Sequence, residues 1–401
     1  MKRGILMECL VKIYNNEQLS NLISVLSFKP KKVIFIYDDN INDVNALSSI
    51  EYACVEKVEG INLEFVNVNS QSLDDVSKKC KKIIHRNRSC YFDITGSEEL
   101  VAIGAYLACA KNFVPIFKMD IKRRKLINIY GCNFLSEKFS MPKMSINTLL
   151  MSHGANIEGY FHPTPNENLF EPILEFSDIV FNNITSWKEM CVYIQTGAKA
   201  QFVEAKPLDF NSPINIPNTK AHLTYNAQKL LHSAQKLGFI YNLKIDSENC
   251  RFKFKDLPIK KYLTDFGSWL ELYVFIKLKQ SNIFDDVRLS VKLNWDRVKK
   301  STSEVVNEID VTFFNGIHPV FVSCKLSDPS TEALQELSMY PNYFGGCYSK
   351  CIMVTLGNFK AERNSVYNRA IQMGIGVIDA SDIKKDRFIE TIKRILKIKE
   401  K

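Results

Sequence analysis

Short apolar runs alternate with segments of helical periodicity in the N-terminal part of the chain. The runs that predict strands are residues 4–13, 32–37, 63–68, 90–94 and 114–119. The segments that predict helices, with apolar residues every three or four positions, are 17–27, 40–58, 72–85 and 98–110. Strands that are apolar on both faces are typical of a parallel sheet covered by helices on both sides. We therefore expect a doubly wound, Rossmann-like α/β domain that ends near Gly131.

Polar residues follow three of these predicted strands directly, at 14–17, 38–40 and 95–98. In open parallel sheets, ligands bind beyond the carboxyl ends of the strands. The sequence Thr-Gly-Ser-Glu at 95–98 suits such a site, because glycine lets the backbone approach a ligand and the following helix N-terminus attracts phosphate. The same hydroxyls also suit helix caps, a very common role of Ser and Thr. No GxGxxG motif is present, so NAD binding is not supported.

The regular alternation stops after residue 131. Prolines and Asn-rich stretches punctuate the middle of the chain, where 219–237 predicts an amphipathic helix. His153 and His162 have no Cys, Asp or Glu at metal-ligand spacing, so we expect them in the core or on the surface. We expect a ligand-sensing domain at 1–139, a connector or extension at 140–240 and a second domain at 241–401.

The C-terminal part contains a predicted helix followed by a predicted hairpin. The helix, 267–276, is apolar apart from Glu271. The apolar runs 305–314 and 319–325 flank Asn315-Gly316, a dipeptide that strongly favours a hairpin turn.

The hairpin places acidic and basic side chains together. Glu308 and Asp310 are two residues apart, so a strand projects both from the same face, and the same holds for Ser323 and Lys325. Carboxylate oxygens are ligands for Mg²⁺ or Mn²⁺, which generate hydroxide from water and stabilise charge on phosphorus, while a lysine orients water or neutralises phosphate oxygens. A cross-strand salt bridge explains one acid and one base, but not a second acid on that face and Glu271 on the helix. The pattern therefore favours metal-assisted phosphodiester hydrolysis.

Composition limits the classes of protein that the chain can represent. With 401 residues, 46% hydrophobic and 24% charged, it is long enough for two domains and too apolar to be disordered. The eleven cysteines form no CxxC pair, which favours reduced thiols in the cytoplasm. No signal peptide is apparent, and no window approaches the roughly 18 apolar residues of a membrane span. The net charge of +9 permits binding to a polyanion without requiring it.

Five segments carry a family resemblance that spans both ends of the chain. They are Phe92-Asp93-Ile94-Thr95-Gly96-Ser97-Glu98-Glu99-Leu100, Gly267-x-Trp269-Leu270-Glu271, Asn307-Glu308-Ile309-Asp310-Val311, Val322-Ser323-Cys324-Lys325 and Phe344-Gly345-Gly346. Together they resemble the CRISPR ancillary nucleases, in which a CARF domain (CRISPR-associated Rossmann fold) precedes a restriction-endonuclease-like PD-(D/E)xK domain. The resemblance implies a nuclease of type III CRISPR antiviral defence that a cyclic oligoadenylate activates.

The resemblance also implies roles for residues of the nuclease domain. It assigns Asp310 as the central metal ligand, Lys325 as the catalytic lysine, Glu271 as the helix acid and the backbone carbonyl of Cys324 as a further ligand. Ser323 stands where the family pattern has an acid. Either Glu308 supplies the missing charge from the same face, or the affinity for metal is lower, with a preference for Mn²⁺.

For the sensor, the resemblance implies a homodimer that binds one cyclic tetra-adenylate across its two-fold axis. The residues that it places at the ligand are Asn15, Asn16, Thr95, Gly96 and Ser97. The sequence leaves open whether the substrate is DNA or RNA, and whether Trp295 or Tyr340 stacks on single-stranded bases or packs in the core. It also leaves open an alternative function, a CARF-type regulator whose nuclease-like domain binds nucleic acid without cutting it. A sensor that degrades its own activator is a third option.

Overall fold

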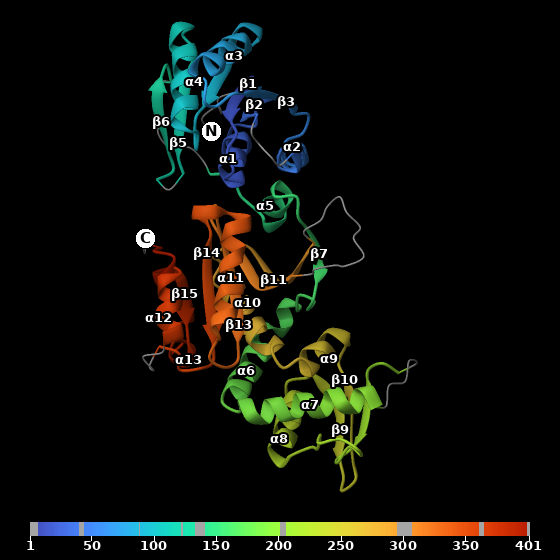
Figure 1. The fold of residues 1–401 in the computed structure, drawn as a ribbon. Helices are drawn as coiled ribbons and strands as arrows, with labels where there is room; N and C mark the ends of the chain where they lie inside the picture. Colours follow the sequence, from blue (N-terminus) through green and yellow to red (C-terminus); the bar gives the residue numbers. More distant parts are fainter. Residues whose placement is uncertain are drawn as a thin grey trace.

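The computed structural model describes residues 7–39, 44–87, 89–121, 123–132, 141–200, 206–294, 307–360 and 365–398. Figure 1 shows three parts stacked along the long axis of the molecule: the N-terminal sheet with its helices, a second sheet in the middle, and a small sheet with helices at the far end. The two large sheets have six strands each and the small one has three.

The N-terminal sheet has the order β3-β2-β1-β4-β5-β6. Its strands are β1 (Cys9–Ile13), β2 (Lys32–Asp38), β3 (Asn62–Val68), β4 (Cys90–Asp93), β5 (Ile116–Asp120) and β6 (Lys125–Tyr130). Its helices are α1 (Gln18–Phe28), α2 (Val44–Lys57), α3 (Leu73–Arg86) and α4 (Glu99–Lys111). Strands β1 to β5 pair in parallel, which confirms the predicted doubly wound fold. Strands β2 and β3 are added on one side of β1, and strands β4 to β6 on its other side. The topological switch point therefore lies between β1 and β4.

Strand β6 was not predicted from the sequence. It pairs antiparallel with β5 at the edge of the sheet and leaves Ile127 and Ile129 largely exposed. Because most of its side chains do not enter the core, it lacks the continuous apolar run of the parallel strands.

The second sheet is mixed and has the order β15-β14-β13-β12-β11-β7. Its C-terminal strands are β11 (Asp285–Asn294), β12 (Asn307–Asn315), β13 (His318–Lys325), β14 (Lys350–Thr355) and β15 (Ile375–Ile378). The helices of this region are α10 (Ser268–Gln280), α11 (Thr331–Phe344), α12 (Ser365–Gln372), α13 (Ala380–Lys384) and α14 (Phe388–Ile395), with a short 3-10 turn η2 (Gly346–Tyr348). The predicted hairpin is confirmed, since β12 and β13 pair antiparallel and Asn315 pairs with His318.

The middle of the chain contributes to two different sheets. Helix α5 (Ile146–Ser152) is followed by β7 (Asn156–Tyr160), which pairs antiparallel with β11 and completes the second sheet. The remaining elements are η1 (Glu167–Leu169), α6 (Phe170–Phe181), α7 (Ile184–Ala200), β8 (Asp209–Pro213), α8 (Tyr225–Lys236), β9 (Ile240–Ile245), β10 (Asn249–Phe254) and α9 (Leu257–Thr264). Strands β8, β10 and β9 form the small sheet. Residues 140–240, expected as a connector, therefore also supply an edge strand of the C-terminal sheet.

One hydrophobic cluster joins the first sheet to the second. It contains Leu22 of α1, Leu149 of α5 and Phe344 of α11, all fully or nearly fully buried. Burial of apolar surface between the two parts stabilises their contact. No disulfide bond joins any of the eleven cysteines, all of which lie in the described ranges. Within the described ranges, no helix has the length and hydropathy of a membrane span.

Candidate functional site

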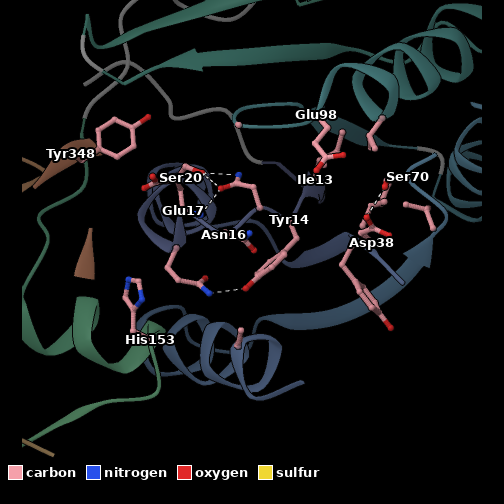
Figure 2. Close-up of a pocket in the computed structure, with 18 residues that line it drawn as sticks. Ile13, Tyr14, Asn16, Glu17, Ser20, Asp38, Ser70, Glu98, His153 and Tyr348 are labelled. Atoms are coloured by element: carbon pink, nitrogen blue, oxygen red, sulfur yellow. Dashed lines mark hydrogen bonds between the residues drawn. The ribbon is translucent and has the colours of Figure 1, made fainter. Parts of the chain in front are cut away.

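A pocket of about 770 Å³ lies beyond the carboxyl ends of the strands at the switch point (Figure 2). Asn15, Asn16 and Gly96 line it from the N-terminal sheet. His153, just after α5, and Tyr348, just before β14, line it from the other side. The pocket is thus closed by residues from both large parts of the molecule.

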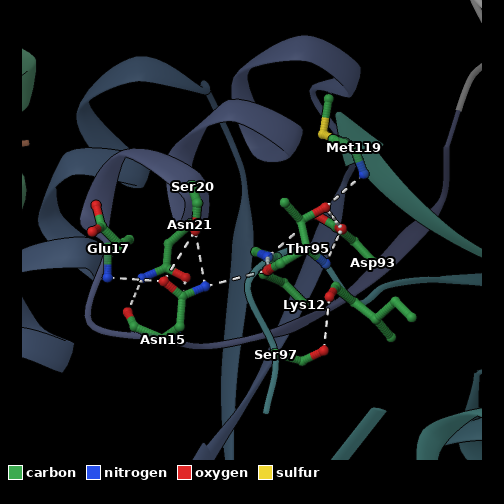
Figure 3. Close-up of polar contacts among 10 residues, drawn as sticks. Lys12, Asn15, Glu17, Ser20, Asn21, Asp93, Thr95, Ser97 and Met119 are labelled. Atoms are coloured by element: carbon green, nitrogen blue, oxygen red, sulfur yellow. Dashed lines mark hydrogen bonds and ion pairs between the residues drawn. The ribbon is translucent and has the colours of Figure 1, made fainter. Parts of the chain in front are cut away.

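A buried ion pair lies next to the turn that carries Gly96 of the pocket lining (Figure 3). Lys12 of β1 and Asp93 of β4 are both fully buried, with Lys12 Nζ 3.5 Å from Asp93 Oδ2. Lys12 Nζ also donates to the carbonyl oxygen of Thr95 at 2.6 Å, and Asn15 Nδ2 donates to the same oxygen at 3.2 Å. Burial lowers the pKa of Lys12, and the neighbouring Asp93 carboxylate opposes that effect. The pair fixes the turn at 95–97 that faces the pocket.

The predicted ligand residues occupy two different environments. Asn15, Asn16 and Gly96 line the pocket, and Gly96 has a φ of +74°. A Cβ atom at Gly96 would lie 2.5 Å from Asn15 Nδ2, so the close approach requires glycine. Thr95 is 3% exposed, and its Oγ1 accepts from the backbone N–H of Met119 at 2.7 Å and donates to Asp93.

Ser97 donates from Oγ to the carbonyl of Ile94 at 2.8 Å. The Thr95 and Ser97 hydroxyls are therefore engaged inside the chain. Helix α4 receives no side-chain cap, because Glu98 occupies its N-cap position without a capping hydrogen bond. The capping alternative raised by the sequence is thus not realised here.

Carboxylates line the pocket at positions that the sequence did not single out individually. Glu17 and Glu98 flank the ends of β1 and β4, and Asp38 ends β2. Asp38 Oδ2 accepts from Ser70 Oγ at 2.5 Å. The described lining residues include no Lys or Arg. Carboxylates of this kind can accept hydrogen bonds from the amino groups and hydroxyls of a ligand.

A second, much smaller cavity of about 30 Å³ lies in the C-terminal sheet. Glu308, Asp310, Ser323 and Lys325 all line it, so the hairpin brings these predicted residues together. Asp310 Oδ2 accepts from the backbone N–H of Cys324 at 2.7 Å and from Ser323 Oγ at 3.3 Å. These bonds orient the Asp310 carboxylate from the neighbouring strand.

Glu271 projects from α10 toward the same carboxylates. Its Oε2 accepts from Ser290 Oγ at 2.9 Å. Burial raises the pKa of Glu271 well above its usual range, and the Asp310 and Glu308 carboxylates raise it further. Burial likewise raises the pKa of Asp310 and of Glu308. Closely spaced buried carboxylates with raised pKa values form a site that favours bound positive charge.

Other residues surround this centre without having been predicted. His162 is 1% exposed, and its Nε2 lies 2.9 Å from Asp265 Oδ2 at the start of α10. Glu336 of α11 lines the small cavity. Tyr340 donates from its hydroxyl to the carbonyl of Glu308 at 2.8 Å. Tyr340 is 5% exposed and therefore belongs to the core rather than to a stacking surface, while Trp295 lies outside the described residues.

The donor set suits a hard cation in its chemistry. Carboxylate and hydroxyl oxygens are the ligands of Mg²⁺ and Mn²⁺, and the raised pKa values indicate negative charge that lacks compensation. In the described parts of the chain, however, no three His, Cys, Asp or Glu side chains are arranged to hold a metal ion. Glu271 is instead bonded to Ser290, and Asp310 to Cys324 and Ser323. The residue types therefore suit a bound cation. The backbone group of Cys324 that contacts Asp310 is its N–H, not its carbonyl.

Comparison with known families supports an endonuclease domain in the C-terminal part. Residues 260–395 match the family described as "Card1-like, endonuclease domain". This range contains Glu271, Glu308, Asp310, Ser323 and Lys325. Among curated protein sequences, none matches the chain.

Solved structures share the fold over nearly the whole chain. Protein VC1899 from Vibrio cholerae is 16% identical, with a TM-score of 0.75 over 96% of this chain and 97% of that one. Can2 from Sulfobacillus thermosulfidooxidans, solved in complex with cyclic tetra-adenylate, is 18% identical, with a TM-score of 0.67 over 96% and 99%. A type III CRISPR defence DNA nuclease activated by cyclic oligoadenylate is 13% identical, with a TM-score of 0.52 over 87% and 45%. The resemblance expected from the sequence thus holds for the endonuclease segment and for the fold.

Proposed function

We propose that this chain is a cyclic-oligoadenylate-activated nuclease of type III CRISPR defence that hydrolyses phosphodiester bonds in DNA. The observation that carries the proposal is the convergence of Glu271, Asp310 and Lys325 on one partly buried acidic centre, inside the segment that matches the endonuclease family. RNA is the alternative substrate, because DNA and RNA both present a phosphodiester group to the residues of the centre.

Each residue of the centre has a distinct task in this proposal. Asp310, fixed by the Cys324 N–H and Ser323 Oγ, and Glu271, fixed by Ser290, would provide oxygen ligands for a divalent cation. Lys325 lines the same cavity and neutralises negative charge that develops on phosphate oxygens in the transition state. A bound Mg²⁺ or Mn²⁺, held by Asp310 with Glu271 and Glu308, would supply Lewis-acid activation of the attacking water. The Cys324 carbonyl is a further candidate ligand.

Ligand sensing is assigned to the pocket at the switch point. Its position beyond the strand ends, the glycine turn at Gly96 and the amide side chains of Asn15 and Asn16 suit a nucleotide ligand. Cyclic tetra-adenylate is the proposed activator, since the structural relative Can2 was solved with it. Tyr348 and His153 join this pocket to the nuclease part, so a ligand that contacts them differently in two states shifts their relative arrangement.

A homodimer is proposed to form through the outer face of α4. This face exposes Leu100, Ile103, Tyr106 and Leu107, whereas the opposite face of the helix is buried. A contiguous exposed apolar face is typical of a protein interface. A symmetric pair would bring two copies of the pocket to one symmetric ligand.

Cleavage assays on purified protein test the nuclease proposal. Supercoiled plasmid, single-stranded DNA and single-stranded RNA are incubated with Mn²⁺ or Mg²⁺ in the presence of cyclic tetra-adenylate, with Asp310→Ala and Lys325→Ala as controls. We expect cutting by the wild type and none by either variant. Ligand binding without cutting of any substrate would favour the alternative function, a regulator with an inactive nuclease-like domain.

A further inference from the structure

Ser290 occupies an unusual position in the middle of β11. Its φ is +47°, in the left-handed region that residues other than glycine rarely adopt, and its side chain is fully buried. A left-handed serine inside a strand is strained, and strain of this kind persists only where surrounding contacts enforce it. One such contact is the backbone N–H of Phe161, which donates to the Ser290 carbonyl at 2.9 Å.

The backbone irregularity coincides with a change of packing in the sheet. Ser290 lies between two paired positions, Leu289 with Val311 and Val291 with Ile309. Leu289 and Val311 belong to the hydrophobic cluster that includes α10, whereas Val291 and Ile309 belong to the cluster that includes α11. A regular strand would keep residues two apart on one face. Both paired strands change the cluster on which alternate residues pack at this point, and Ser290 marks the change in β11 next to Asp310.

The hydroxyl of Ser290 is aimed at the acidic centre. It donates to Glu271 Oε2 at 2.9 Å. Ser290 belongs to β11 and Glu271 to α10, so the hydroxyl fixes the acid of the helix from the neighbouring sheet.

We propose that Ser290 is a positioning residue of the nuclease centre, whose strained backbone aims its hydroxyl at Glu271 and holds that carboxylate in place. This inference rests on the proposed nuclease function for its kinetic consequences. A serine here costs conformational energy that glycine would avoid, and the hydroxyl is what serine adds to glycine.

Paired substitutions separate the role of the hydroxyl from the role of the backbone. Ser290→Gly removes the hydroxyl and relieves the left-handed strain, whereas Ser290→Ala removes the hydroxyl and keeps the strain. We expect both variants to lose kcat by about 10- to 100-fold with little change in KM, as typical for groups that orient active-site ligands. Ser290→Cys, a near-isosteric weak donor, should recover part of the loss.

Thermal stability distinguishes positioning from structure. The Ser290→Gly variant should melt no lower than the wild type, so its loss of kcat would not follow from unfolding. The controls are Ser177→Ala, a buried serine whose hydroxyl donates to the Ile173 carbonyl, and Asn282→Gly, which relieves a left-handed residue at the end of α10. Both controls should retain wild-type kcat.

Crystal structures of the wild type and of Ser290→Gly test the inference independently of activity. We expect the Glu271 carboxylate to leave its present position in the variant. An unmoved Glu271 together with wild-type kcat in Ser290→Gly would overturn the inference. If the wild type itself cuts no nucleic acid, the proposed function fails, and the position of Glu271 alone decides the role of Ser290.

Discussion

Glu17, at the mouth of the sensor pocket, lies directly against Gly346 of the nuclease part. A Cβ atom at Gly346 would lie 2.1 Å from Glu17 Oε1, and Gly346 has a φ of +47°. Two residues later, Tyr348 lines the same pocket, and its carbonyl accepts from His318 Nδ1 at 2.8 Å. His318 begins β13, the strand that ends at Lys325. A short stretch of chain therefore links the sensor pocket to the proposed catalytic lysine.

Replacing Glu17 by Ala should weaken the coupling between pocket and nuclease. The change removes the side chain that contacts Gly346 and leaves the rest of the pocket in place. We expect the ratio of cleavage rates with and without ligand to fall, because coupling free energies of this kind are about 1–3 kcal/mol. Titration of ligand-stimulated cleavage measures the effect. Glu8→Ala removes an exposed acid that pairs with Lys31 and serves as the control; an unchanged activation ratio in Glu17→Ala would contradict the link.

Replacing Ile103 by Glu should break the proposed homodimer. Ile103 is 52% exposed at the centre of the apolar face of α4, and a buried charge there opposes association. Light scattering after size exclusion should give a monomer for Ile103→Glu. Val55, 54% exposed on α2, offers a matched control, and Val55→Glu should remain dimeric. A dimeric Ile103→Glu protein would place the interface elsewhere.

Replacing Glu271 by Gln should raise the stability of the metal-free protein at neutral pH. Burial raises the pKa of Glu271, so the folded state binds more protons than the unfolded state above the ordinary value of 4.5. Wild-type stability should therefore fall as pH rises through that window, and Gln removes this loss. We expect the melting temperature of Glu271→Gln to exceed that of the wild type by an amount that grows from acidic to neutral pH.

The exposed Glu175 provides the control for this series, since Glu175→Gln should follow the wild type at every pH. Added Mn²⁺ should reduce the difference in melting temperature between Glu271→Gln and the wild type, because it binds the folded wild type. A difference in melting temperature that shrinks as pH rises would show that Glu271 does not carry an uncompensated buried charge.

Replacing Lys12 by Met should destabilise the sensor domain strongly. The change leaves Asp93 buried without its cation, which typically costs about 3–5 kcal/mol. Adding Asp93→Asn to the same chain should restore part of the loss, because no charge then remains buried. Denaturant unfolding of the single and double variants measures both effects. Equal stability of Lys12→Met and wild type would contradict the role of the pair.

Local sequence signals predicted much of this fold. Alternating apolar runs predicted the parallel strands, and Asn315-Gly316 predicted the hairpin that brings Asp310 beside Ser323. The pairing of β7 with β11 joins segments far apart in sequence, and no local pattern encodes it.

Functional residues were harder to predict where tertiary contacts decide their role. Ser290 carries no mark of its left-handed backbone in the sequence, because the surrounding sheet imposes it. Lys12 is a cation inside an otherwise apolar predicted strand, and this position in the sequence indicates that it needs a buried acidic partner. Glu17 faces Gly346 only because the two parts of the molecule pack together.

The central claim is that ligand in the sensor pocket switches on cutting by the Asp310 centre. The direct measurement is the initial rate of DNA cleavage by the wild type with and without cyclic tetra-adenylate, under one fixed Mn²⁺ concentration, beside Asp310→Ala. The account predicts a rate that rises with ligand and is absent from the variant under both conditions. A wild-type rate that is the same with and without bound ligand, or cutting that survives in Asp310→Ala, would contradict it.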